Sequence, residues 1–417
     1  MTTIVFFNRS YWPDTGATGQ LLTELAEDLV ARHHCAVTVV TGYPVRSRET
    51  LPATEVRNGV RIVRAAGTAY DPQRVPLRVL NYLTYFLSAC IAALRIPSAD
   101  IVVAMTDPPI IGLAARLTVR RTRARFVFLC EDVFPEVTIL LEGFRSRRVD
   151  ALLMRISRHL VRRADTVVAL GETMKARLVS GKGADPSRVA VIHNWADCTA
   201  LKPGAKDNGF ARTHALHDRF VVMHAGNIGL SQSFDVILDA ATRLQGDPAI
   251  RFVIVGDGAK RAALQRDVAT RRLTNVQFVP YQTRTGMAES YAAADVFLVT
   301  LKPGLAGYIV PSKLYTILAA GRPYVAAVEP DCEVAHITHE HGCGIVVNPG
   351  DGAAMAEAIL QLYRDREGAT AMGARARAAG LIFDRPRQVA AYAKLFAAPI
   401  PAANRVRSTT HDPRPTT

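Results

Sequence analysis

The sequence is poor in cysteine, and the six cysteines among its 417 residues are scattered. No two of them form a C-x-x-C pair, and none lies at zinc-ligand spacing from a histidine. This pattern excludes a disulfide framework and argues against a structural zinc site. A D-x-D pair of carboxylates, which could carry a cation to a diphosphate, is also missing, so we expect no metal and no bound cofactor.

The N-terminus has neither the basic region nor the small-residue cleavage site of a signal peptide. Met1-Thr2-Thr3 leads directly into apolar Ile4–Phe7, which predicts a strand. A reducing, cytoplasmic compartment is therefore the simplest expectation. The longest charge-free run, residues 79–94, is 16 residues long, whereas a membrane span needs about 20. Its length favours a buried core helix over an interfacial one.

Acidic residues are too few to balance the basic ones, which leaves a net charge of +14. The excess is local, because twelve arginines face five acids between Arg116 and Arg163. The sequence has no zinc finger, no clear helix-turn-helix and no basic stretch interleaved with aromatics, so nucleic acid is not the expected partner. Residues 147–163 predict an amphipathic helix with Arg155, Arg158 and Arg162 on its polar face. Such a helix suits an anionic membrane surface, although an ordinary solvated face is the alternative.

Short apolar runs alternate with helical patterns along the chain, which is typical of a parallel α/β fold. Two series of such runs are separated by a turn-rich segment around residue 205. We therefore expect an N-terminal Rossmann-like domain over 1–204 and a C-terminal one over 205–380. A final helix over 381–400 should pack back on the first domain, and 401–417 should be a disordered tail. The predicted strands are 3–7, 36–41, 59–65, 101–104, 125–129, 166–170, 189–192, 220–223, 252–255, 276–279, 296–299, 324–327 and 344–347.

Residues 309–323 predict a helix of about two turns whose start suits a phosphate. Ser312 is placed to cap the helix, Leu314 belongs to its apolar stripe, and Gly321 ends it. Lys313 adds an ammonium group beside the positive end of the helix dipole. Together these features indicate a diphosphate site, with one more βα unit of an open sheet as the alternative reading.

Three further strand ends of the second domain and one of the first carry small or polar loops, and ligands of doubly wound sheets bind at such ends. In the second domain, the loop after residue 223 could form an anion nest from backbone N–H groups. In the first domain, the loop before a helix expected near Leu21 is marked by two glycines. The candidates are Gly226, Asn227, Gly229 and Gln232 for the diphosphate, and Gly256, Asp257, Tyr281, Gly16, Thr18 and Gly19 for other parts of a ligand.

At this point the chain resembles the retaining GT-B glycosyltransferases of family 4, over essentially residues 1–397. Within that family it is most similar to the exopolysaccharide and O-antigen branch, which includes colanic-acid and N-acetyl-L-fucosamine glycosyltransferases. The resemblance implies two doubly wound domains that face each other across a cleft. The matching motifs are Pro13-Asp14-Thr15-Gly16, Glu131-Asp132-Val133-Phe134-Pro135-Glu136, His193-Asn194-Trp195, Gly226-Asn227-Ile228-Gly229, Val255-Gly256-Asp257-Gly258 and Pro311-Ser312-Lys313-Leu314.

The resemblance implies transfer of a sugar from a nucleotide diphosphate sugar, with UDP slightly favoured over GDP, without a metal ion. The expected acceptor is a polyprenyl-diphosphate-linked glycan, and the expected place is the inner face of the plasma membrane. Asp132 and Glu136 are the catalytic candidates, Asp132 as a base for the acceptor hydroxyl or as a ligand of a donor hydroxyl. The resemblance also implies that Gly256, Asp257 and Tyr281 bind the base of the nucleotide, and that Gly16, Thr18 and Gly19 face the acceptor or the sugar. The family's paired glutamates are replaced here by Tyr308 and Thr316, so no ribose ligand is carried over.

Two other classes of function remain open from the sequence. A sugar-nucleotide 2-epimerase uses the same two-domain architecture without an acceptor, and it would not need a basic helix. A catalytically silent nucleotide-binding scaffold would explain the missing glutamates. The presence of both the Ser312-Lys313 helix start and the Gly226 loop favours a transferase, since decay would alter both.

Overall fold

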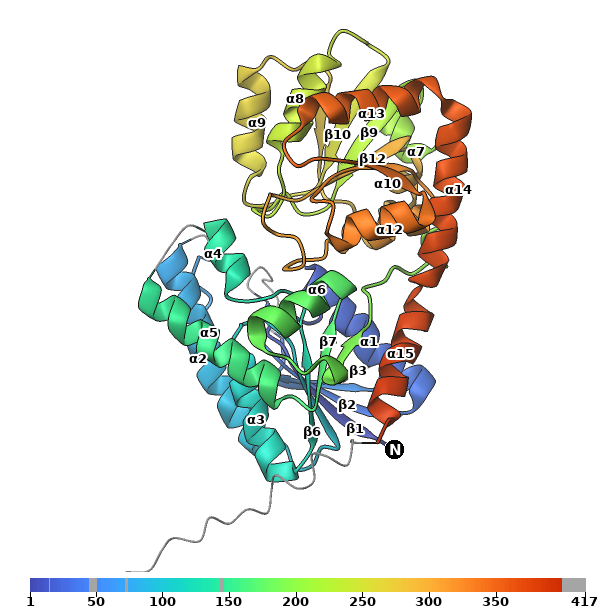
Figure 1. Ribbon diagram of the computed structural model, residues 1–417. Helices are drawn as coiled ribbons and strands as arrows, with labels where there is room; N and C mark the ends of the chain where they lie inside the picture. The colour runs from blue at the N-terminus through green and yellow to red at the C-terminus, as the bar shows by residue number, and fades with distance from the viewer. Residues whose placement is uncertain (15, 45–50, 72–73, 143–145, 400–417) are drawn as a thin grey trace, which may run out of the picture.

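The computed structural model describes residues 1–399 apart from 15, 45–50, 72–73 and 143–145, so the tail predicted for 401–417 lies outside the described residues. The chain forms two α/β domains, each built on its own sheet with helices on both faces (Figure 1). The predicted architecture of two doubly wound sheets is confirmed.

The first domain has an eight-stranded sheet of order β3-β4-β2-β1-β5-β6-β7-β8, in which only the β3–β4 pair is antiparallel. Its strands over 101–104, 125–129 and 166–169 are buried along their whole length, as expected for a sheet covered on both faces. The strands are β1 Thr3–Phe7, β2 Ala36–Thr41, β3 Thr54–Arg57, β4 Val60–Arg64, β5 Ile101–Ala104, β6 Arg125–Leu129, β7 Thr166–Ala169 and β8 Val189–Val191. The helices are α1 Ala17–His33, α2 Val75–Arg95, α3 Ile111–Thr122, α4 Glu136–Glu142, α5 Arg147–Arg163, α6 Glu172–Arg177, the π-helix η1 Leu178–Lys182 and the 3-10 helix η2 Pro186–Arg188.

The second domain has a six-stranded parallel sheet of order β11-β10-β9-β12-β13-β14. The order reverses at β9, and this switch point is where such sheets hold their ligands. The strands are β9 Phe220–Ala225, β10 Ile250–Val255, β11 Val276–Val279, β12 Val296–Thr300, β13 Tyr324–Ala327 and β14 Gly344–Val347. The helices are α7 Gly209–Thr213, α8 Asp235–Arg243, α9 Arg261–Thr270, α10 Arg284–Ala292, α11 Lys313–Ala320, α12 Glu333–His341, α13 Gly352–Arg364 and α14 Arg366–Ile382.

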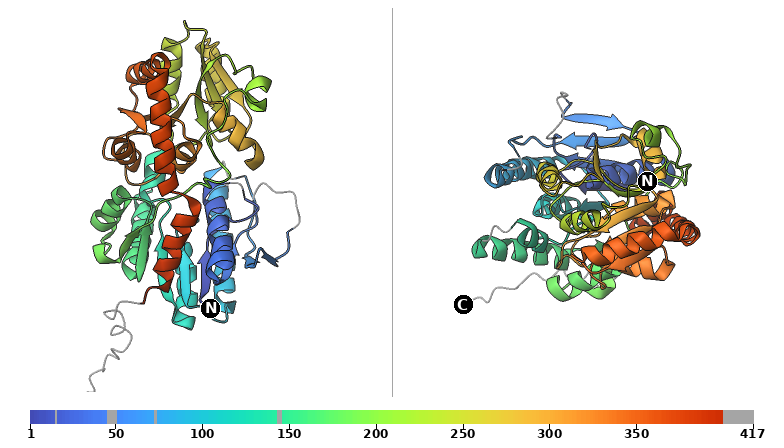
Figure 2. Two further views of the ribbon diagram at one scale, coloured as in Figure 1. Left: turned by 90° about the vertical axis from the view of Figure 1, so that its right-hand side faces the viewer. Right: turned by 90° about the horizontal axis from the view of Figure 1, so that it is seen from above.

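The chain returns to the first domain through α14 and α15 (Arg385–Ala397), which run along one side of the molecule (Figures 1 and 2). The ring of Phe396 on α15 lies 6.3 Å from that of Phe6 on β1. At the start of α15, the guanidinium of Arg385 donates to both carboxylate oxygens of Asp28 on α1, at 2.7 and 2.9 Å. The helix expected over 381–400 therefore corresponds to α15, which covers one face of the first sheet.

The apolar runs located the strands to within three residues, but two local predictions were wrong. The sequence missed β3, because an edge strand that pairs only with β4 needs little apolar content. Helix α1 begins at Ala17 rather than near Leu21, so Thr18 and Gly19 lie in its first turn instead of in a loop.

Residues 79–94 form a helix, as predicted, but the prediction that this helix is buried was wrong. The helix α2 exists, but Leu83, Leu87 and Ile91 on one of its faces are 47 to 63 % exposed. Its opposite face, with Tyr85 and Ala89, belongs to the core. Length alone could not reveal this arrangement, because both faces of the helix are apolar.

Candidate functional site

Three loops of the second domain meet at the carboxyl ends of β9, β10 and β11. The amide of Gly226 donates to the carbonyl of Val255 at 3.0 Å, and the amide of Gly256 donates to the carbonyl of Val279 at 3.1 Å. Gly256 has a φ of 142°, and a Cβ there would lie 1.9 Å from the carbonyl oxygen of Gly226. Only glycine allows this approach of the two loops. The structure thus brings the predicted diphosphate and base segments together.

Lys313 is the central cation of this site. Its side chain is half-buried and reaches the Gly226 loop. If Gly226 carried a Cβ, that atom would lie 3.8 Å from Nζ of Lys313. Burial lowers the pKa of Lys313 to about 7. Among the described residues no carboxylate forms an ion pair with it. A half-buried ammonium without a counter-ion is suited to an anionic ligand.

His224 on β9 is a site residue that the sequence analysis missed. Its Nε2 lies 3.2 Å from Nζ of Lys313, and the imidazole is fully buried beside the ring of Phe234. Burial, together with the nearby Lys313 charge, holds the pKa of His224 well below its usual range. The neutral ring can accept a hydrogen bond from the ammonium and so fix its position. A histidine inside an otherwise apolar strand was the available signal.

Three amides of the loop that begins at Gly226, where the sequence predicted an anion nest, are already hydrogen-bonded within the protein. The amide of Gly226 is already bonded to Val255, and the amide of Ile228 donates to the carbonyl of Asp257 at 2.8 Å. The amide of Gly229 donates to the side-chain oxygen of Gln232 at 3.3 Å. Gln232 is buried and therefore supports the loop, while Asn227 is exposed at its tip.

The start of α11 also differs in detail from its prediction. Ser312 makes no side-chain capping hydrogen bond, and its backbone is already helical. The amide of Leu314 donates to the carbonyl of Pro311, which tightens the first turn. Gly321 ends the helix in the left-handed conformation, as expected. The helix therefore brings Lys313 and its positive end to the loops of β9 and β10 without a side-chain cap.

Asp132 approaches this site from the first domain, on the loop that follows β6. It forms a β-bridge with Ile309, and the amide of Val133 donates to the carbonyl of Tyr308 at 2.9 Å. Ile309 lies only four residues before Lys313. The backbone thus joins the catalytic candidate of one domain to the diphosphate candidate of the other.

The two carboxylates of this loop have strongly perturbed acidities. Burial, with the charge of Asp107 as a second cause, raises the pKa of Asp132 to about 7. Burial and the neighbouring Asp132 raise the pKa of Glu131 to about 8. A carboxylate whose pKa lies near neutrality is suited to accept a proton from a hydroxyl group. Asp132 therefore remains the base candidate, with Glu131 beside it.

Asp107 ties this acidic region to the loop after β1. Its carboxylate accepts a hydrogen bond from the hydroxyl of Ser10 at 2.7 Å and forms an ion pair with Arg9 at 3.3 Å. The guanidinium of Arg9 also lies 5.1 Å from the ring centre of Tyr82 on α2. Arg9 is thus a half-buried cation at the carboxyl end of β1, near Asp132, which the sequence analysis did not identify.

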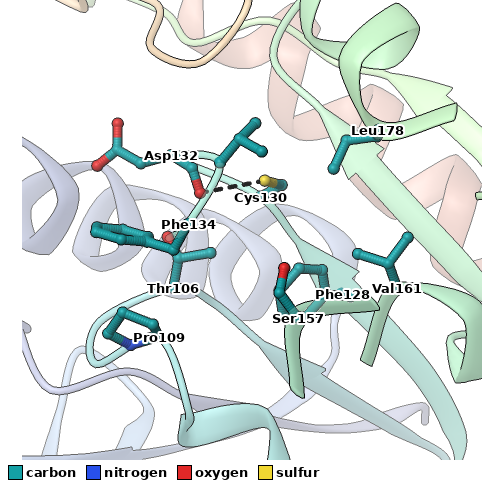
Figure 3. A pocket seen from close by; sticks show the side chains of 10 residues that line it. Thr106, Pro109, Phe128, Cys130, Asp132, Phe134, Ser157, Val161 and Leu178 are labelled. Carbon is teal, nitrogen blue, oxygen red and sulfur yellow. Dashed lines mark hydrogen bonds between the residues drawn. The ribbon is translucent and has the colours of Figure 1, made fainter. Parts of the chain in front are cut away.

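A small hollow lies beside Asp132 in the first domain, with about 240 Å³ of space that includes open solvent (Figure 3). Asp132 lies on one side of it and Val161 on the opposite side. The thiol of Cys130 donates to the backbone carbonyl of Asp132 at 3.3 Å. The hollow is lined by Thr106, Pro109, Phe128, Cys130, Asp132, Val133, Phe134, Ser157, Val161 and Leu178.

Glu136, the second catalytic candidate, is engaged in a structural ion pair. Nζ of Lys182 lies 2.7 Å from its Oε2 and 2.7 Å from the carbonyl oxygen of Phe134, and the Lys182 side chain is fully buried. Because this buried ammonium needs the carboxylate, we assign Glu136 a structural role and retain Asp132 alone as the base.

The remaining candidates occupy different surroundings. Gly16 precedes α1 as its N-cap, and Gly19 packs closely on Ser10, so this loop lies beside Arg9 and Asp107. Asp257 and Tyr281 are exposed at the ends of β10 and β11.

On α5, Arg155, Arg158 and Arg162 are exposed, as predicted for the polar face. Two of them are also hydrogen-bonded to backbone, since Arg158 donates to the carbonyl of Gly181 at 3.3 Å and Arg162 to that of Lys182 at 3.2 Å.

Tyr308 and Thr316 replace the missing glutamates and have partners of their own. Arg177 lies over the Tyr308 ring at 4.9 Å, and the Thr316 hydroxyl lies 3.2 Å from that of Tyr291. No group of three or more histidine, cysteine, aspartate or glutamate side chains within the described part of the chain could hold a metal ion.

Two doubly wound domains, with a lysine at a helix start on one side and a carboxylate on the other, have the architecture of the GT-B fold. Family models match both halves of the chain. Residues 16–195 match the glycosyl transferase 4-like domain, and residues 219–365 match the glycosyl transferases group 1. The chain belongs to this family, family 4 of the glycosyltransferases.

Relatives and solved structures agree with this assignment. The chain is 31% identical to a probable glycosyltransferase WbjE of Pseudomonas aeruginosa, over 64% of this chain and 67% of that protein. It is 25% identical to the putative colanic acid biosynthesis glycosyl transferase WcaI of Escherichia coli (strain K12), over 86% of this chain and 91% of that one. The fold resembles Anabaena Alr3699/HepE in complex with UDP and glucose, with a TM-score of 0.74 at 17% identity, over 96% of this chain and 100% of that one.

Proposed function

We propose that this glycosyltransferase moves a sugar from a nucleotide diphosphate sugar, with UDP favoured over GDP, to a lipid-linked glycan in surface polysaccharide synthesis. The observation that carries the proposal is Lys313, a half-buried cation that reaches the Gly226 loop and is held by His224. Complexes of Anabaena HepE with UDP and the naming of WcaI for colanic acid biosynthesis support the choice of donor and pathway class.

In the proposed reaction, the ammonium of Lys313 and the start of α11 stabilise the negative charge that develops on the leaving diphosphate. Asp132 accepts the proton of the attacking acceptor hydroxyl. The Asp132–Ile309 bridge keeps these two groups in register across the domain interface. We assign no protein nucleophile. We propose that the acceptor oxygen bonds to the anomeric carbon on the same face from which the diphosphate oxygen leaves, so that the configuration is retained, and that no metal ion takes part.

The proposed acceptor is a polyprenyl-diphosphate-linked glycan at the inner face of the plasma membrane, with the enzyme bound peripherally from the cytoplasm. The arginine-rich α5 supports an anionic surface as partner, because six of its seventeen residues are arginine and Asp150 is its one acid. Arg9 is a half-buried cation that pairs with Asp107, close to Asp132. We propose that it also contacts an anionic group of the acceptor.

The test is transfer of labelled sugar from UDP- and GDP-sugars to a synthetic polyprenyl-diphosphate disaccharide, with EDTA present throughout. Transfer with an unchanged anomeric configuration, lost in Lys313→Ala, would support the proposal. Conversion of the free nucleotide sugar to its 2-epimer without an acceptor would instead identify an epimerase. Nucleotide binding with neither reaction would identify a silent scaffold.

A further inference from the structure

Helix α2 is apolar on the face that solvent reaches as well as on the face that packs. The inward face repeats every four residues through Asn81, Tyr85, Ala89 and Ala93, all of which are buried. On the outward side, six large aliphatic side chains are 41 to 63 % exposed, and we call them the α2 stripe. The α2 stripe consists of Val79, Leu80, Leu83, Leu87, Ile91 and Leu94.

A solvated helix of a soluble protein carries charged and polar residues on its outward face. Here no charged residue occurs between Arg78 and Arg95. By helix geometry the α2 stripe is about 22 Å long, at 1.5 Å per residue. An exposed apolar surface of this extent marks an interaction site.

Two further helices of the first domain also expose aliphatic side chains. Leu140 of α4 and Val149 and Leu152 of α5 are 44 to 57 % exposed. Helices α2, α4 and α5 lie on the same flank of the first domain in Figure 1, and α2 and α5 share that flank in the view from above in Figure 2. Exposed aliphatic side chains therefore occur on more than one helix of this flank.

The surroundings of this surface are positively charged. Arg74 and Arg95 are exposed at the two ends of α2. On α5, the arginines at 147, 148 and 155 are exposed beside the two exposed aliphatic residues. Long basic side chains at the edge of an aliphatic surface are typical of helices that lie in an anionic bilayer interface, where the stems stay in the apolar layer and the charges reach the headgroups.

The structure excludes a spanning orientation for α2 in this fold. Residues Pro76–Arg95 are long and apolar enough to cross a membrane, with a mean hydropathy of 1.5. However, the Tyr85 hydroxyl donates to the carbonyl of Val40 at 3.4 Å, and the Asn81 amide donates to the carbonyl of Tyr70 at 2.9 Å. Pulling α2 into a bilayer would break these contacts and open the core of the first domain. The helix must therefore stay on its domain and lie parallel to any membrane it meets.

A second copy of the chain is a poorer partner for the same surface. A two-fold contact through the α2 stripe would bring the arginine-rich α5 helices of both copies towards each other. Like charges at such an interface repel, whereas an anionic bilayer neutralises them. The charge pattern therefore selects the bilayer.

We propose that the α2 stripe, with Val149 and Leu152 of α5, inserts into the apolar layer of an anionic membrane, so that the enzyme is held by aliphatic insertion and not by arginine charge alone. Binding of this kind resists salt, because screening weakens only the electrostatic part.

The position of α2 also links the membrane to the reaction centre. Tyr82 of α2 lies under the guanidinium of Arg9, and Arg9 pairs with Asp107 near Asp132. Insertion of α2 would thus bring the acceptor side of the first domain to the headgroup layer. This last step rests on the proposed lipid-linked acceptor, whereas the insertion itself does not.

The experiment is co-sedimentation of the full chain with vesicles of phosphatidylcholine containing 30% phosphatidylglycerol, at about 0.1 and 0.5 M NaCl. The test variant is Leu83→Gln/Leu87→Gln/Ile91→Gln. Its matched control is Leu381→Gln/Ile382→Gln, which changes two aliphatic residues of α14 that are 42 and 45 % exposed. Thermal unfolding and UDP affinity verify that each variant is folded.

We expect wild type and control to remain bound at 0.5 M NaCl, and the α2 variant to lose at least tenfold in partitioning at that salt concentration. A second readout uses Leu87→Trp, whose fluorescence should shift to the blue with vesicles, whereas that of Leu381→Trp should not. Equal binding of the α2 variant and wild type, or an unshifted Leu87→Trp, would overturn insertion. Sedimentation velocity showing a dimer that the α2 variant abolishes, without vesicle binding, would assign the surface to a second copy. Loss of vesicle binding with unchanged transfer to a soluble acceptor would leave the proposed reaction intact.

Discussion

Nζ of Lys313 lies 3.2 Å from Nε2 of His224, and no carboxylate pairs with this ammonium among the residues described. A lysine held by a neutral imidazole keeps its position while its charge stays uncompensated. The cost of half-burying that charge lowers the pKa of Lys313 to about 7. Lys313 without an anion beside it therefore loses its proton more readily than a solvated lysine.

We expect UDP binding at pH 8 to take up a proton. Above pH 7 the free enzyme holds Lys313 mostly neutral, and a diphosphate beside Nζ raises the pKa, so the complex binds a proton that the free protein lacks. Titration calorimetry in two buffers with different ionisation enthalpies measures this uptake, which should approach one proton per UDP. In Lys313→Met it should disappear, and an unchanged uptake in that variant would contradict the assignment.

Gly256→Ala should abolish UDP binding or weaken it by tenfold or more. At a φ of 142°, the added Cβ would lie 1.9 Å from the carbonyl oxygen of Gly226, so the loops of β9 and β10 must separate. We also expect a loss of about 1 to 3 kcal/mol in the free energy of unfolding, measured with urea. Gly246→Ala is the control, because a Cβ at Gly246 meets nothing within 4 Å. Equal affinities in both variants would show that the loop contact is dispensable.

Asp132→Asn should lower turnover by about 10² to 10⁴ and leave UDP affinity unchanged. The pKa of Asp132 is raised to about 7, so the carboxylate form is lost as the pH falls through 7. Wild-type turnover should therefore drop about tenfold per unit of pH below 7, and the residual activity of the variant should not. If turnover of the variant falls below pH 7 as steeply as that of wild type, Asp132 is not the base.

Glu136→Gln should destabilise the protein by about 3 to 5 kcal/mol, because it leaves the buried ammonium of Lys182 without its carboxylate. Glu136→Gln/Lys182→Met should be more stable than Glu136→Gln, since the uncompensated charge is then removed. Urea unfolding of the three proteins provides the comparison. If the single variant is as stable as wild type but inactive, Glu136 is catalytic after all.

The sequence predicted the two sheets well, because buried parallel strands such as 101–104 and 324–327 are apolar throughout and are bounded by polar turns. It also placed Lys313 at the start of a helix, since the helix start and Gly321 are local signals. It could not identify His224, whose role depends on a contact 89 residues away in sequence. Nor could it separate Asp132 from Glu136, because only the fold places Lys182 beside Glu136.

The exposure of α2 was missed for a related reason. The apolar run from 79 to 94 has no polar face, so its sequence does not indicate which side of the helix packs on the sheet. Only the packing of Tyr85 and Ala89 on the first sheet reveals that Leu83 and Leu87 lie outward. The same packing turned a predicted core helix into a candidate membrane contact.

The most direct test of the account is calorimetric titration of wild type and Lys313→Ala with UDP, GDP and their monophosphates, with and without EDTA. We predict micromolar binding of UDP to wild type that EDTA does not change, and at least tenfold weaker binding to Lys313→Ala. Binding of UMP should be nearly equal in the two proteins, because the lost contact is to the diphosphate. Equal UDP affinity in both proteins, or UDP binding that EDTA abolishes, would contradict a metal-independent diphosphate site at Lys313.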